Sequence, residues 1–123
     1  MLIRFSEGET MHELSVMMEV VKTVEEEARK NNVTKIKTLT LQVGEISSVV
    51  PEYIKDCYEA AFKETMLEGA ALEIEVIPAE AKCAECGNIY NIKKTKAICP
   101  RCGSREAGLI TGREFMIKEA SGE

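Results

Sequence analysis

The spacing of four cysteines constrains this chain more than any other feature. Cys83 and Cys86 form one Cys-x2-Cys pair, Cys99 and Cys102 form a second, and twelve residues separate the pairs. Two such pairs supply the four sulfur ligands that a tetrahedral zinc site requires. A site closed by four protein ligands has no open coordination position, so the sequence predicts a structural Zn(II) and not a catalytic one.

The residues around these pairs are those of a zinc ribbon. Gly87 and Gly103 directly follow the second cysteine of each pair, where a tight turn often needs a positive φ. Between the pairs, residues 89–92 suit a short strand and residues 93–96 a polar turn. The sequence therefore predicts a ribbon over residues 82–105. The alternative is a pair of disulfides, which the spacing and the expected compartment disfavour.

The start of the chain shows no targeting signal. Residues 1–5 are too short for the apolar region of a signal peptide and run into a polar stretch at residues 6–9. No apolar run approaches the length of a membrane-spanning helix. We therefore expect a cytoplasmic protein without membrane contact, in a compartment where cysteines bind metal more often than they pair.

Charge is distributed unevenly along the chain. The 123 residues carry a net charge of −5, which argues against a nucleic-acid-binding protein as a whole. Residues 82–105 nevertheless hold six basic residues against one acid, so this segment is +5 and the remainder is −10. A basic ribbon on an acidic body can contact phosphate, meet an acidic protein surface or remain solvated.

Two stretches show helical periodicity. The first begins at His12, where Thr10 and Glu13 can form a capping box. The second begins at Pro51, a residue suited to a first helical turn, and ends by Gly69. The apolar residues of the first helix recur at intervals of three and four and predict its buried face. They are Leu14, Met17, Met18, Val21, Val24 and Ala28.

Three stretches read as strands, at residues 35–43, 72–77 and 108–118. The third should return to the first sheet, because its apolar face needs the same core. The predicted fold is α+β, with two helices packed on a small three-stranded sheet and an inserted four-cysteine zinc ribbon. The predicted division is an N-terminal extension (1–10), an α+β domain (11–81 and 106–118), the ribbon (82–105) and a polar tail (119–123).

Little in the sequence indicates catalysis. His12 is the single histidine, and no Ser-His-acid triad, P-loop or glycine-rich dinucleotide turn is present. Cys57 lies in the apolar stripe of the second helix, as expected for an unreactive core thiol. We therefore expect a protein that is not an enzyme.

The start of the first helix offers a different chemistry. A lone histidine at such a position is most often a solvated cap residue. The backbone amides of His12 and Glu13, however, have no partner within the helix. If deprotonated, they can join the imidazole as square-planar nitrogen ligands, a geometry that Ni(II) and Cu(II) favour.

Short motifs along the chain form a distinctive combination. They are Met11-His12-Glu13-Leu14-Ser15, Val43-Gly44-Glu45, Pro51-Glu52, Gly69-Ala70 and the two Cys-x2-Cys pairs. Over residues 11 to about 118, the chain resembles the HypA family of nickel metallochaperones of [NiFe]-hydrogenase maturation. The Met-His-Glu start and the four-cysteine ribbon are specific in combination, whereas either alone would be weak.

The resemblance implies a function and a set of partners. It implies that His12 and nearby backbone nitrogens bind Ni(II), with Glu13 next to the site, and that the four cysteines hold Zn(II). It also implies delivery of nickel to the hydrogenase large subunit, with the GTPase HypB as a partner; some relatives also serve urease. We expect a monomer or a weak homodimer.

The chain departs from the family pattern at two places. In the family, Met-His-Glu usually begins the chain, so the free amine can bind nickel; here ten residues precede Met11. Some relatives carry an acidic residue in the loop before the second helix, where residues 47–50 here are Ser-Ser-Val-Val. With the extension attached, the site must use the Met11 amide at higher pH, borrow a side chain such as Glu13 or Glu45, or stay empty.

Two other functions compete with nickel delivery. The ribbon can bind nucleic acid through Lys93, Lys94, Lys96 and Arg101, but its sole aromatic residue, Tyr90, offers little for base stacking. The chain can also be a zinc-stabilised adaptor in which His12 is idle.

Overall fold

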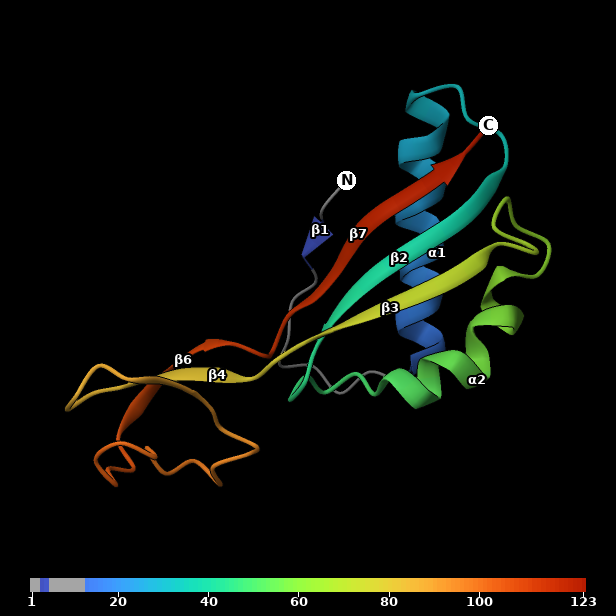
Figure 1. The fold of residues 1–123 in the computed structure, drawn as a ribbon. Coiled ribbons are helices and arrows are strands. Elements are labelled where there is room, and N and C mark those ends of the chain that lie inside the picture. Colours follow the sequence, from blue (N-terminus) through green and yellow to red (C-terminus); the bar gives the residue numbers. More distant parts are fainter. Residues whose placement is uncertain (1–2, 5–12) are drawn as a thin grey trace.

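The computed structural model describes residues 3–4 and 13–123. In Figure 1, two helices cover one face of a larger sheet, and a smaller sheet projects from one end of it. The elements in chain order are β1 (Ile3–Arg4), α1 (Glu13–Lys30), β2 (Ile36–Gly44), α2 (Pro51–Phe62), β3 (Ala71–Ile77), β4 (Glu80–Cys83), β5 (Ile89–Asn91), β6 (Ala107–Thr111) and β7 (Phe115–Gly122). We call the helices and larger sheet the body, and residues 80–111 the ribbon.

The larger sheet has the order β1-β7-β2-β3 and confirms the α+β fold. Strand β2 lies in its centre, parallel to β3 and antiparallel to β7. The parallel pair requires a crossover, which α2 supplies. In register, Leu41 pairs with Ile74 of β3 and Ile117 of β7, so one row of apolar residues faces the helices. Strand β1 adds a fourth strand to the three that the sequence predicts, pairing Ile3 with Ile117.

Helix α1 contributes six buried residues to the core of the body. Met17, Val21 and Val24 are buried as predicted, but Leu14 and Met18 are 42% and 58% exposed. Val16 and Val20 are buried in their place, so the face that meets the sheet is rotated toward these valines. Periodicity predicts that a helix has an apolar face, but an apolar residue at the border of that face can still be exposed.

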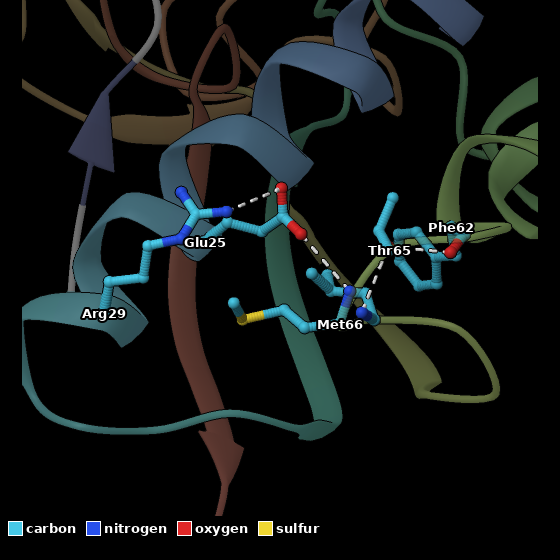
Figure 2. Close-up of polar contacts among 6 residues, drawn as sticks. Glu25, Arg29, Phe62, Thr65 and Met66 are labelled. Atoms are coloured by element: carbon cyan, nitrogen blue, oxygen red, sulfur yellow. Dashed lines mark hydrogen bonds and ion pairs between the residues drawn. The ribbon is translucent and has the colours of Figure 1, made fainter.

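The segment after α2 is tied to α1 by Glu25 (Figure 2). The helix ends at Phe62, earlier than Gly69, and turns lead to β3. Glu25 Oε2 accepts a hydrogen bond from the Met66 amide at 3.2 Å, while Oε1 lies 3.9 Å from Arg29 Nη2. Thr65 Oγ1 donates to the Phe62 carbonyl at 2.7 Å. Glu25 is therefore a tertiary contact and not a free surface charge.

The predicted strand 108–118 is two strands that belong to different sheets. β6 pairs with β4 in the smaller sheet, of order β5-β4-β6, and β7 pairs with β2 in the larger one. The change occurs at Gly112, whose φ is +121° and where a Cβ would lie 2.6 Å from Ala79 Cα. Only glycine fits such a position without strain, so the chain turns there from one sheet to the other.

The ends of the ribbon and of the last strand also differ from prediction. The smaller sheet extends from Glu80 to Thr111, beyond the predicted limits of 82 and 105. Residues 119–122 belong to β7 and are not a tail, because β7 continues along β2 until Gly122 pairs with Ile36. Within the described part of the chain, neither helix has the length and apolar character needed to cross a membrane.

Candidate metal centre

The four cysteines meet at one point in the ribbon. Their sulfur atoms all lie within 4.8 Å of one another. The Sγ–Sγ distance is 3.5 Å between Cys83 and Cys102 and 3.6 Å between Cys86 and Cys99. A tetrahedron with Zn–S bonds of ~2.3 Å has sulfur–sulfur edges of about 3.8 Å, so the site fits this metal. These separations are well beyond the ~2.05 Å of a disulfide, and all four cysteines are free.

Two similar turns present the sulfurs. The Gly87 amide donates to the Cys83 carbonyl at 3.1 Å, and the Gly103 amide donates to the Cys99 carbonyl at 2.8 Å. Both glycines have the positive φ that the sequence predicts, +75° and +76°. The backbone hydrogen bonds of each turn therefore hold its cysteine pair in place independently of a metal.

The electrostatics of the cluster call for a cation. Burial disfavours the Cys99 thiolate, but the backbone amides of Cys102 and Arg101 outweigh it and lower the pKa of Cys99 to about 6. For Cys102, the Ser104 amide favours the thiolate, yet the hydrogen bond with Cys83, burial and the other two thiols raise its pKa to about 12. Four thiols this close cannot all ionise alone, whereas a bound divalent metal removes that conflict.

The ribbon has only a small core of its own. Ala81, Cys83, Tyr90 and Cys99 are its buried residues, so two of the four are cysteines of the cluster. The body has a separate and much larger buried cluster, formed by both helices and the larger sheet. The ribbon is therefore the part of the chain whose folding most needs a metal.

The predicted nickel residues are only partly described. His12 lies outside the described residues. Glu13 is the first residue of α1 and is half-buried. Cys57 of α2 packs against the body core, and burial, followed by the nearby Glu13 charge, raises the pKa of its thiol. Cys57 is thus a protonated core thiol, and Glu13 lies on the side of α1 that meets α2.

Glu45 has a role that the sequence did not reveal. Its Oε1 accepts hydrogen bonds from the Ala79 amide at 2.9 Å and from Asn91 Nδ2 at 3.0 Å. Asn91 belongs to β5, so this carboxylate of the body reaches into the ribbon. A Gly-Glu pair after a strand indicates a loop, but nothing in the sequence names the partners that such a glutamate finds.

An α+β body with an inserted, closed four-cysteine site defines a small metal-binding protein. Residues 11–121 match the family model described as HypA, hydrogenase/urease nickel incorporation, metallochaperone. The chain belongs to the HypA family.

Curated relatives match along most of their length. The chain is 39% identical to the hydrogenase maturation factor HypA of Streptomyces avermitilis, over 87% of this chain and 83% of the relative. It is 41% identical to that of Trichormus variabilis, over 89% and 93%. The fold is similar to the solution structure of the Ni metallochaperone HypA from Helicobacter pylori, with a TM-score of 0.63 at 24% identity over 91% of this chain and 97% of that one. A second solution structure, of a HypA protein, gives 0.68 at 24% identity over 94% and 98%.

Proposed function

We propose that this protein carries Ni(II) during the maturation of a nickel enzyme, a [NiFe]-hydrogenase or also a urease. The observation that carries this proposal is the match to the HypA family over residues 11–121, which includes the Met11-His12-Glu13 motif. A metallochaperone binds and passes on its metal, and the family is not a family of enzymes. The acceptor in this proposal is the hydrogenase large subunit, the partner is the GTPase HypB, and the compartment is the cytoplasm.

We assign the two metals to the two parts of the chain. In this proposal Cys83, Cys86, Cys99 and Cys102 hold a structural Zn(II), which the tetrahedral spacing of their sulfurs supports. Ni(II) is cargo and binds at the start of α1, through the His12 ring and the backbone nitrogens of His12 and Glu13. Glu13 opens α1, so its amide is among those without an intrahelical partner, which supports this assignment.

Calorimetric titration of Ni(II) into zinc-loaded protein tests the nickel assignment. His12→Ala should abolish specific nickel binding while the zinc content stays at one per chain. Glu19→Ala, which removes an exposed carboxylate from the same helix, is the matched control and should bind nickel like the unmodified protein. Unchanged nickel affinity in His12→Ala would reject the site. Transfer is measured separately, as nickel gained by a purified hydrogenase large subunit.

A further inference from the structure

The body and the ribbon meet at a joint formed by residues 44–46, 77–79 and 111–114. The Glu45 amide donates to the Ile77 carbonyl at 2.8 Å, and the Ile46 amide donates to the Gly112 carbonyl at 2.9 Å. The loop after β2 therefore contacts both the segment that leaves the body and the segment that returns to it (Figure 1). These backbone bonds hold the two connecting segments, but they do not reach the ribbon beyond them.

The Glu45 side chain extends the joint into the ribbon. One oxygen of its carboxylate accepts from the Ala79 amide, in the connecting segment, and from Asn91 Nδ2, at the end of β5. Two bonds at one oxygen, 2.9 Å and 3.0 Å long, fix the carboxylate between the two parts. Hydrogen bonds to a charged acceptor are roughly twice as strong as neutral ones.

Asn91 is built to present its amide to Glu45. Its Oδ1 accepts from the backbone amides of Lys93 and Lys94, at 3.0 Å each, and so caps the turn that follows β5. Because the oxygen is used in this turn, the amide nitrogen must point the other way, toward Glu45. The turn thus sets the orientation of the side chain that the carboxylate binds.

The hydrogen bonds that Glu45 accepts favour its ionised form. The Ala79 amide and the Asn91 side chain, with smaller contributions from Lys93 and Lys94, keep the pKa of Glu45 below its ordinary value. The Glu45 carboxylate is therefore charged at neutral pH.

We propose that Glu45 is a positioning residue that sets the orientation of the four-cysteine ribbon on the body, with Asn91 as its hydrogen-bond donor in the ribbon. Breaking this contact leaves both parts folded and lets the ribbon turn about the connecting segments. The inference goes beyond the proposed function and does not depend on nickel binding. It also assigns Glu45 to the joint, where its carboxylate is unavailable to a nickel ion while the contact is made.

Asn91→Asp breaks the contact selectively. Aspartate keeps the Oδ1 that caps the turn, but it replaces the donor toward Glu45 with a second carboxylate oxygen, and like charges then face each other. Glu119→Gln, which removes an exposed carboxylate from β7, is the control.

Residual dipolar couplings of zinc-loaded, full-length protein report the relative orientation of the two parts. We expect one alignment tensor to fit body and ribbon in the unmodified protein and in Glu119→Gln, and two distinct tensors in Asn91→Asp. A single tensor in Asn91→Asp, or two tensors already in the unmodified protein, would overturn the proposal. If Asn91→Asp loses zinc, Glu45→Ala carries the same test, because it leaves the Asn91 turn intact.

Discussion

Removal of the ribbon metal should unfold one part of the protein and spare the other. The perturbation is either a strong chelator or Cys99→Ser, which removes a buried ligand of the cluster. Without the metal, the ribbon retains a buried cluster of four residues, of which two are cysteines. The body retains its own core, to which both helices contribute. We therefore expect two separable responses.

The magnitudes favour this separation. Tyr90 is the largest side chain of the ribbon cluster, and its burial contributes about 2–3 kcal/mol. A structural zinc contributes on the order of 10–16 kcal/mol in small zinc domains, several times more than that contact. In the body, α1 and α2 comprise 18 and 12 residues, and both lie far from the sulfurs in sequence. Loss of zinc should thus leave the circular dichroism at 222 nm nearly unchanged.

The assay combines metal analysis, circular dichroism and amide spectra. Freshly purified protein should contain one zinc per chain, and chelation should collapse the amide dispersion of residues 80–111 while the helical signal persists. Cys57→Ser, which changes a thiol outside the cluster, is the matched control and should keep its zinc. The absence of zinc from freshly purified protein, or a full loss of helical signal on chelation, would refute the reasoning.

Four further predictions concern nickel, the partner, the Glu25 contact and the joint. Protein trimmed to begin at Met11 should bind Ni(II) more tightly at neutral pH than the full chain, because a neutral amine coordinates more readily than an amide that must first lose a proton. The affinity of the full chain should rise more steeply with pH, as measured by calorimetry. Glu26→Lys on α1 should weaken HypB binding without changing the zinc content. Glu25→Lys should instead lower the free energy of unfolding by about 1–3 kcal/mol, because it removes the contact with the Met66 amide. Gly112→Ala should lower the free energy of unfolding, measured in urea, by about 1–3 kcal/mol or more. The reasons are the positive φ of residue 112 and the close approach of Ala79 to a Cβ at this position.

Each of these has an outcome that contradicts it. An unchanged free energy of unfolding in Glu25→Lys would show that the Met66 contact does not contribute to stability. Equal nickel affinities of the two forms at neutral pH would show that the amine is not needed. Unchanged HypB affinity in Glu26→Lys would show that this exposed position of α1 takes no part in HypB binding. A Gly112→Ala variant as stable as the unmodified protein would show that the joint adapts to a side chain at that position.

Local sequence signals predicted the features that depend on local chemistry. The cysteine spacing, with Gly87 and Gly103 behind it, predicted a tetrahedral cluster because each turn is built by its own backbone bonds. Pro51 marked the first residue of α2, and the strand at β3 was placed to within one residue. These elements follow from short-range preferences that tertiary contacts did not override.

Features decided by tertiary contacts escaped prediction. Residues 108–118 have one continuous strand pattern, and only the approach of Ala79 shows why the chain must turn at Gly112. Glu25 reads as half of an exposed helical ion pair, yet it also binds the Met66 amide 41 residues away. Glu45 reads as a loop carboxylate, and its partners lie 34 and 46 residues further along the chain. Sequence periodicity carries no information on such separations.

The position of the ribbon between β3 and β7 has a consequence for the order of folding. The chain leaves the body after Ile77 and returns at Phe115, so 37 residues must be closed into a loop before β7 can pair with β2. Once β4 and β6 have paired between Glu80 and Thr111, five flexible residues remain in that loop. The closure entropy then falls by roughly 2 kcal/mol, from the logarithmic dependence on loop length. A metal that folds the ribbon therefore also speeds and stabilises the docking of β7, a strand that contains none of its ligands.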